Sequence, residues 1–297
     1  MTADRTLDRI AALPCWAGPV EIAPLAGGIT NRNFLVTDRA AGRFVARLGD
    51  DIPVHGVMRF NELAAARAAH AAGLSPEVVH AGDGILVSRF IDGRTFDPAM
   101  VRAPENRGRI VQLIRRLHTD VARHLRGPVL AFWPFQVILS YLGTLADDGH
   151  PMAGALPRLA EIARRLERAV GPVTMVFAHN DLLAGNLLDD GARLWLIDWD
   201  YAGFDSPLFD LANLSSNNAF TAEDDAWLLA AYFGSRPDAG TARGFQAMKC
   251  ASLLRETLWS AVSERRSAIA FDYPAYTADY LGRFEEAYRT FASSEDP

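Results

Sequence analysis

Roughly the first 90 residues alternate short apolar runs with polar turns, a pattern typical of β-strands. Residues 34–37 and 43–48 are two such runs separated by a short polar turn, which predicts a β-hairpin. The alanine-rich stretch 61–72 predicts a helix, and Gly73 is a typical helix stop. Residues 84–91 predict a further strand. This part of the chain therefore predicts a small β-rich lobe around one helix.

Helical periodicity dominates the rest of the chain. Apolar side chains recur at the spacing of one helical face at Ile110, Leu113, Ile114 and Leu117, and again at Leu159, Ile162 and Leu166. Two short strands, 174–177 and 193–197, interrupt this pattern, and helical patterns return from Asp224 to the end. We therefore expect an α+β fold of two lobes, a small β-rich lobe over residues 1–92 and a larger, mostly helical lobe over residues 93–297.

The clearest chemical signal is a loop in which Asp181 and Asn186 lie five residues apart, shortly after His179. Asp198 follows at the end of the predicted strand 193–197. Phosphoryl transfer from ATP needs a carboxylate near the acceptor hydroxyl, oxygen ligands for Mg²⁺ and positive charge on the phosphates. Each residue alone could be a helix cap or turn former, but the ordered set between apolar strands predicts a phosphotransferase. Hard oxygen ligands of this kind favour Mg²⁺ over zinc.

The small lobe contains the other parts that a nucleotide site requires. A glycine pair within residues 26–31 would let backbone N–H groups approach phosphates, although a plain turn fits as well. Arg47 could be an ordinary strand charge, or with Glu62 it could form a phosphate-binding cation and its orienting carboxylate. Adenine would bind to backbone near the end of the strand before the lobe junction. The ATP-binding residues predicted in this way are Gly28, Thr30, Asn31, Arg47, Glu62, Ser88 and Phe90.

Charge and composition narrow the function classes. The formal net charge of -6 argues against a general nucleic-acid binder, which needs a basic surface. Cys15 and Cys250 lack metal-ligand spacing, and two thiols are expected in a reducing cytosol. The first residues lack the apolar segment of a signal peptide, and no apolar run approaches the roughly 20 residues needed to cross a bilayer. We expect a cytoplasmic protein without membrane insertion; nothing in the sequence indicates its oligomeric state.

These residues carry a resemblance to the choline/ethanolamine kinase family, within the aminoglycoside phosphotransferase and protein-kinase-like superfamily. The resemblance covers nearly the whole chain, in order 27–31, 44–48, the helix with Glu62, 87–91, the loop from His179, 197–201 and 209–213. It implies that Asp181 is the catalytic base and that Asn186 and Asp198 bind Mg²⁺. It also implies that His179 orients the catalytic loop, while Asp210 is expected to brace it through backbone hydrogen bonds.

The acceptor is indicated by the C-terminal stretch 255–276, which is similar to the choline kinase tail. A quaternary ammonium has no N–H donor, so aromatic faces hold it best through cation–π attraction, with carboxylates nearby. Periodicity alone would make Trp259 and Phe271 ordinary core aromatics. Glu256 is a departure, because choline kinases of eukaryotes tend to have another tryptophan there. The predicted acceptor-binding residues are Asp200, Tyr201, Trp259, Phe271 and Tyr276.

The resemblance therefore implies an ATP-dependent kinase that phosphorylates the hydroxyl of choline or ethanolamine to give, for choline, phosphocholine. An aminoglycoside, thiamine or other small-molecule phosphotransferase is the first alternative. Aminoglycosides are polycations that call for many carboxylates, and the aromatic residues in the tail weigh against them. A nucleotide-binding regulator without catalysis is the second alternative, and the retention of Asp181, Asn186 and Asp198 argues against it.

Overall fold

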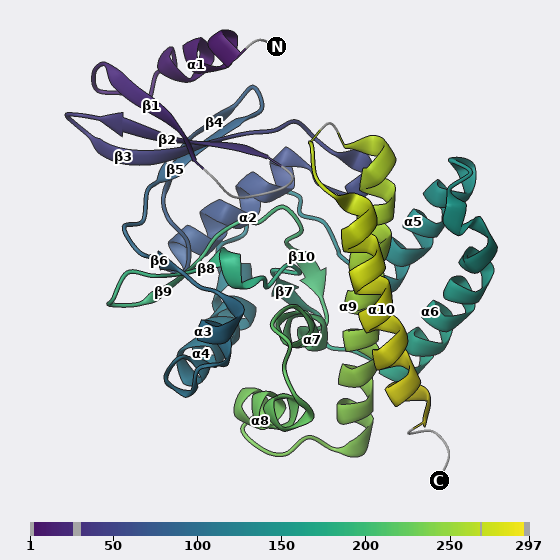
Figure 1. The fold of residues 1–297 in the computed structure, drawn as a ribbon. Coiled ribbons are helices and arrows are strands. Elements are labelled where there is room, and N and C mark those ends of the chain that lie inside the picture. The colour runs from purple at the N-terminus through teal and green to yellow at the C-terminus, as the bar shows by residue number, and fades with distance from the viewer. Residues whose placement is uncertain (1–2, 26–30, 268, 294–297) are drawn as a thin grey trace.

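An antiparallel sheet of five strands forms one end of the molecule in the computed structural model, which describes residues 3–25, 31–267 and 269–293 (Figure 1). The strand order is β1-β2-β3-β5-β4. The strands are β1 (Val20–Leu25), β2 (Arg32–Asp38), β3 (Gly42–Leu48), β4 (Val78–Gly82) and β5 (Ile85–Arg89). β2 and β3 form the predicted hairpin, and β5 is the predicted strand at 84–91, shorter at both ends. β1 and β4 were not predicted.

One face of this sheet is closed by the short N-terminal helix α1 (Ala3–Ala11). Phe44, Ala46 and Leu48 of β3 are buried in a small apolar cluster with Ile10 of α1. Because side chains alternate along a strand, Arg47 must point to the opposite face of the sheet. The pleat of β3 therefore directs Arg47 toward the rest of the molecule.

Helix α2 (Arg59–Ala71) begins two residues before the predicted helix and ends where Gly73 adopts a positive φ of 72°. Its alanines pack into the apolar core of the helical part of the chain, not into the small cluster beneath α1. Small side chains on this face allow α2 to lie close to its neighbours. A lobe boundary at residues 92 and 93 stays a prediction, since α2 is packed against both the chain before and the chain after that point.

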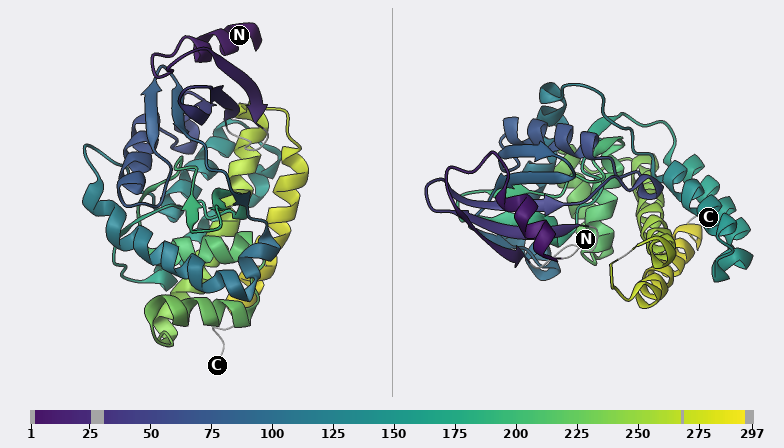
Figure 2. Two further views of the ribbon diagram at one scale, coloured as in Figure 1. Left: turned by 90° about the vertical axis from the view of Figure 1, so that its left-hand side faces the viewer. Right: turned by 90° about the horizontal axis from the view of Figure 1, so that it is seen from above.

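The remaining helices form the larger part of the molecule (Figure 1). They are α3 (Pro98–Arg102), α4 (Pro104–Asp120), α5 (Pro134–Asp147), α6 (Leu156–Val170), α7 (Pro207–Asn217), α8 (Ala222–Phe233), α9 (Ala239–Arg266) and α10 (Tyr273–Ser293). Helix α9 is buried on nearly all sides, with α5, α6, α7 and α10 packed around it (Figure 2). A helix buried in this way positions side chains rigidly. The α+β fold of a small β-rich part and a larger helical part is confirmed.

Short strands organise the centre of the molecule. β7 (Val176–Ala178) pairs with β10 (Gly203–Asp205), and β8 (Leu187–Asp189) pairs with both β6 (Arg94–Thr95) and β9 (Leu194–Leu196). The predicted strands at 174–177 and 193–197 correspond to β7 and β9, whereas β8 and β10 were missed. Asp205 ends β10 and Pro207 begins α7, so only Ser206 lies between these two elements.

Three 3₁₀ turns complete the connections outside this centre, at Pro53–His55, Val121–His124 and Pro151–Ala155. A fourth, Ala184–Asn186, lies between β7 and β8. Among the described residues, no helix is long and apolar enough to cross a membrane.

Candidate active site

The loop between β7 and β8 is held from below by Asp210, at the start of α7. The Asp210 carboxylate is fully buried and accepts the backbone N–H groups of His179 (2.9 Å) and Asn180 (2.7 Å). His118 of α4 donates from Nε2 to the same carboxylate (2.9 Å). These are the backbone bonds expected of Asp210. The contact with Asp210 gives His118 a structural partner.

His179 connects this loop to the next strand. Its Nε2 donates to the backbone carbonyl of Ile197 (3.0 Å), and its ring lies edge-on to Trp199. Burial lowers the pKa of His179, although the nearby Asp210 charge opposes this effect. A fully buried, neutral imidazole fixed in this way fits the predicted orienting role.

Asp181 and Asn186 face each other across the loop. The Asn186 side-chain amide donates to the backbone carbonyl of Asp181 (2.8 Å) and more weakly to its carboxylate (3.3 Å). Because the Nδ2 group points at Asp181, the Asn186 amide oxygen points away from it and is available as a ligand. Burial is the main cause that raises the pKa of Asp181, and the charge of Arg255 opposes it.

Asp198 follows β9 in a left-handed backbone conformation, with φ of 68°. Such backbone is costly for a residue other than glycine and is often found at functional sites. One carboxylate oxygen accepts from Arg47 (2.9 Å), and the side chain is 34% exposed. Burial and the neighbouring Asp200 raise the pKa of Asp198. The strained turn presents this carboxylate beside the loop that carries Asp181.

Arg47 joins the sheet to the catalytic loop through three carboxylates. It donates to Asp198 and to Asp200 (both 2.9 Å) and forms an ion pair with Glu62 of α2. The predicted pairing of Arg47 with Glu62 is therefore present. Although burial works against it, the charges of Asp200 and Asp198 raise the pKa of Arg47, so the guanidinium is permanently charged.

A second arginine, Arg59 at the start of α2, was not predicted. It bridges Glu62 (2.5 Å) and Asp200 (2.8 Å), and it also donates to the side chain of Asn31 (3.0 Å). Its pattern in the sequence gave no signal, because a lone arginine at a helix start is common on protein surfaces. The arginine ties the end of the predicted phosphate loop to the ion cluster.

Asp200 is buried at the centre of this cluster and is 3% exposed. It accepts from Arg47, Arg59 and Asn31. The two arginines lower the pKa of Asp200 despite its burial. The structure therefore places Asp200 among the predicted nucleotide-binding residues. Within the described residues, its hydrogen bonds go to Arg47, Arg59 and Asn31 and not to the aromatic residues of the tail, so its role toward the acceptor stays a prediction.

The other predicted nucleotide-binding residues are only partly described. Gly28 and Thr30 lie outside the described residues. Ser88 is paired within the sheet to β3 and β4, and the Phe90 backbone N–H donates to the carbonyl of Arg43 (3.0 Å). A cavity of about 200 Å³ borders Arg47 and Glu62 between α2 and the turn from β4 to β5. The nucleotide roles of these residues stay predictions.

Three of the four aromatic residues predicted for the acceptor lie together. Tyr276 is between Trp259 and Phe271, with ring centroids 6.2 and 5.5 Å away. Tyr273 and Tyr280 extend the group. The cluster is formed where α9 and α10 meet across the segment 267–272.

Tyr201 lies apart from this aromatic group and contacts it through a buried arginine. The guanidinium of Arg255 stands over the Tyr201 ring at 4.2 Å and pairs with Glu256 (2.6 Å). Glu256 in turn accepts from the Tyr276 hydroxyl (2.9 Å). Arg255 is only 1% exposed, and the sequence gave no signal for it beyond the stretch that resembles choline kinases.

His55 is a further residue that the sequence reasoning missed. It comes from the connection between β3 and α2, yet its ring nitrogens form hydrogen bonds with the hydroxyls of Tyr141 (3.1 Å) and Ser263 (3.0 Å). Its ring also packs on Trp259, with centroids 5.7 Å apart. Burial, and then the charge of Arg255, lowers the pKa of His55 to about 3, so the imidazole is neutral.

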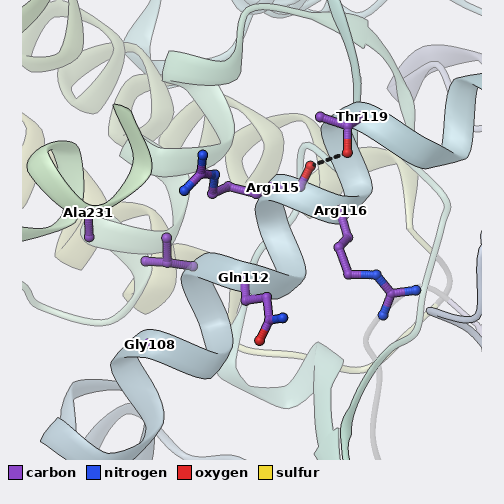
Figure 3. A pocket seen from close by; sticks show the side chains of 7 residues that line it. Gly108, Gln112, Arg115, Arg116, Thr119 and Ala231 are labelled. Atoms are coloured by element: carbon purple, nitrogen blue, oxygen red, sulfur yellow. Dashed lines mark hydrogen bonds between the residues drawn. The ribbon is translucent and has the colours of Figure 1, made fainter. Parts of the chain in front are cut away.

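A second hollow, of about 530 Å³, lies on the outer side of α4 beside Ala231 of α8 (Figure 3). It is lined by none of the predicted site residues. Arg115 and Arg116 point in different directions from α4, so they do not converge on one anion (Figure 3). We assign no function to this hollow.

Comparison with known proteins agrees with this geometry. Residues 21–245 match the model of the phosphotransferase enzyme family. The protein LicA of Haemophilus influenzae is 26% identical over 213 residues, which cover 69% of this chain and 61% of LicA. A probable ethanolamine kinase of Arabidopsis thaliana is 24% identical, with 85% of this chain and 75% of that protein covered. This chain therefore spans less than two thirds of LicA.

A solved structure extends the similarity to nearly the whole chain. It is described as a choline/ethanolamine kinase family protein from Mesorhizobium loti, and it is 31% identical with a TM-score of 0.76. The match covers 97% of this chain and 95% of that one. These matches confirm the predicted fold and the predicted enzyme class. The chain belongs to the phosphotransferase enzyme family and, within it, to the choline/ethanolamine kinase family.

Proposed function

We propose that this protein transfers the γ-phosphoryl group of ATP to the hydroxyl of a small amino alcohol, choline or ethanolamine. The observation that carries the proposal is the joint position of Asp181, Asn186 and Asp198 next to Arg47. The aromatic group around Tyr276, with Glu256 beside it, supports a cationic acceptor. The names of the matched relatives, LicA and a probable ethanolamine kinase, agree with it.

In the proposed reaction, Arg47 binds ATP phosphates and Glu62 holds the guanidinium in place. Asp181 accepts a hydrogen bond from the acceptor hydroxyl, orients it in line with the γ-phosphoryl group and takes up its proton. Asp210 keeps this loop rigid through the two backbone N–H groups that it accepts. Positioning of this kind supplies much of the rate enhancement of a phosphoryl transfer.

The chemistry of the site fits Mg²⁺. Asn186 and Asp198 would hold it, since one presents a free amide oxygen and the other a partly exposed carboxylate. The ion cluster has two guanidinium groups, Arg47 and Arg59, against the carboxylates of Glu62, Asp198 and Asp200, which leaves one negative charge in excess. When bound, the metal would neutralise charge on the phosphates.

Two measurements test the proposal. ATP consumption is measured with choline, ethanolamine, thiamine and kanamycin as acceptors, and turnover with choline or ethanolamine is expected. A response to thiamine or kanamycin alone would replace the proposed acceptor and leave the phosphotransferase assignment intact. The same assay without Mg²⁺ should show no turnover, and added Mg²⁺ should restore it.

The role of Asp181 is tested with Asp181→Ala. We expect turnover to fall at least about 10³-fold while ATP binding, followed by calorimetry, persists, because the ion pairs of Arg47 within the described residues join it to Glu62, Asp198 and Asp200 and not to Asp181. Asp147→Ala, at the exposed end of α5, is the matched control and should retain full activity. Near-wild-type turnover of Asp181→Ala would show that Asp181 is not the base.

A further inference from the structure

Glu256 places a buried carboxylate against the aromatic group of the acceptor site. It lies on α9 one helical turn before Trp259, and it is 7% exposed. One of its oxygens, Oε1, accepts the hydroxyl of Tyr276 (2.9 Å), while Oε2 pairs with Arg255 (2.6 Å). A carboxylate is costly to bury unless its charge and lone pairs are used. Its position therefore calls for a function beyond packing.

Arg255 fixes this carboxylate in place. The guanidinium is 1% exposed, lies over the Tyr201 ring at 4.2 Å and uses Nη1 to pair with Glu256. Arg255 and Glu256 both act electrostatically on Asp181.

The carboxylate of Glu256 has hydrogen-bond acceptor sites that are not used. An ionised carboxylate has about four lone-pair sites. Tyr276 and Arg255 use one site each, and no other donor reaches Glu256 within the described part of the chain. Sites remain on a carboxylate whose neighbours are the rings of Tyr276 and, one turn along the helix, Trp259. The group that completes it would be a cation that can donate hydrogen bonds.

This inference rests on the proposed function and specifies its acceptor. We propose that Glu256 binds the ammonium group of the acceptor through N–H hydrogen bonds, so that the enzyme selects amino alcohols whose nitrogen carries at least one proton over quaternary ones. The rings of Trp259 and Tyr276 attract any cation, quaternary or not. A charge-assisted hydrogen bond to Glu256 distinguishes the two classes, because a quaternary nitrogen has no proton to donate.

The unmodified enzyme can be tested with a series of four acceptors: ethanolamine, N-methylethanolamine, N,N-dimethylethanolamine and choline. The first three are protonated at neutral pH and keep at least one N–H, and only choline has none. We expect kcat/KM to change little over the first three and to fall about 10- to 100-fold at choline, the effect of one hydrogen bond to a charged group. A gradual change of kcat/KM along the series would mean that the site distinguishes the acceptors only by size. A preference for choline would mean that cation–π attraction to the aromatic rings alone selects the acceptor. Either result overturns the inference.

The variant Glu256→Gln tests the residue itself. It keeps the shape but removes the charge, so kcat/KM for ethanolamine should fall at least about 10-fold, mainly through acceptor KM. The kcat/KM for choline should change less, so the difference in kcat/KM between N,N-dimethylethanolamine and choline should become smaller. The KM for ATP should stay unchanged. Glu264→Gln is the matched control, since Glu264 is exposed two turns further along α9 and should leave all values unchanged. An unaltered acceptor preference in folded Glu256→Gln would exclude Glu256 as the selecting residue.

The outcomes separate this inference from the proposed function. Turnover without the drop at choline refutes the inference and leaves the amino-alcohol kinase in place, whereas no turnover with any of the four acceptors refutes both. Because Glu256→Gln leaves Arg255 buried without its charged partner, circular dichroism and thermal melting accompany the assay. If that variant does not fold, the acceptor series on the unmodified enzyme decides by itself.

Discussion

Two buried aspartates five residues apart, Asp205 and Asp210, should lose very different amounts of stability on the same substitution to asparagine. Asp210 carries three hydrogen bonds, from the backbone of His179 and Asn180 and from the ring of His118. Hydrogen bonding and the charge of His118 lower its pKa although burial works in the other direction. Among the described residues, Asp205 accepts only the backbone N–H of Ser206. Burial, with the nearby Asp210, raises the pKa of Asp205 well above its usual range.

The loss of unfolding free energy expected for Asp210→Asn follows from the hydrogen bonds of Asp210. One amide oxygen can still accept from Asn180, but the new NH₂ group faces the donors of His179 and His118. Hydrogen bonds to a buried charged group contribute about 1.5–3 kcal/mol each, so loss of two should cost about 3–6 kcal/mol. Asp205→Asn keeps the shape and the single hydrogen bond of a group whose charged form burial already disfavours. Its cost should stay below about 1 kcal/mol.

The assay is urea unfolding followed by circular dichroism at pH 7, together with kcat for each folded variant. Asp210→Asn should also lower kcat by at least about 100-fold, because the catalytic loop loses its support, while Asp205→Asn should stay within about 2-fold of the unmodified enzyme. Equal loss of stability in the two variants would refute the reasoning, since it would mean that the three hydrogen bonds of Asp210 contribute no more than the single bond of Asp205.

The ionisation of Asp210 also determines how the stability of the fold responds to acid. Because the folded-state pKa of Asp210 lies below its unfolded value of roughly 4, its contribution to stability is complete above that pH. It is lost as the pH falls toward and through the folded-state pKa. Asp210→Asn should therefore show a weaker loss of unfolding free energy between about pH 5 and pH 2 than the unmodified protein.

Three further substitutions test the contacts around the site. Arg47→Lys should raise the KM for ATP at least about 10-fold in steady-state kinetics, because one ammonium cannot span the carboxylates that the guanidinium fork joins. Gly49→Ala should also raise the KM for ATP, since a Cβ there would overlap the side-chain oxygen of Asn31; an unchanged value would show that Asn31 can move without loss. His55→Phe keeps a ring against Trp259 but removes both hydrogen bonds, so the acceptor KM should rise about 5- to 10-fold while the KM for ATP stays constant. A parallel rise in both would mean that His55 only stabilises the fold.

The order of elements was readable from the sequence where local pattern and tertiary packing agree. The β2–β3 hairpin has alternating apolar residues and a polar turn, and α2 has an unbroken run of helix-favouring alanines with a glycine stop. β8 and β10 were missed because strands of three residues have too little periodicity to be seen. Their formation depends on pairing with β9 and β7, which no local window contains.

The catalytic loop was predictable because its residues are close in sequence. Asp181 and Asn186 lie on one short loop, and Asp198 follows the adjacent strand β9, so spacing alone indicates that they meet. Arg59, His55 and Arg255 were not predictable in the same way. Each acts through partners that lie far away along the chain, such as Asp200 for Arg59 and Ser263 for His55, and only the fold brings them into contact.

Asp200 shows how a partner across the chain changes the meaning of a residue. In the sequence, Asp200 lies two residues after Asp198, and its carboxylate suggests attraction of a cationic substrate. In the fold, both of its oxygens are taken by Arg47, Arg59 and Asn31, so little of its charge is left for an acceptor. The opposite holds for Glu256. In the sequence it only replaces a tryptophan of the choline kinase tail, but in the fold its carboxylate keeps lone pairs free beside the aromatic rings. We therefore propose that Glu256 of α9 supplies the charge of the acceptor site, and a change of acceptor preference should follow Glu256 more closely than Asp200.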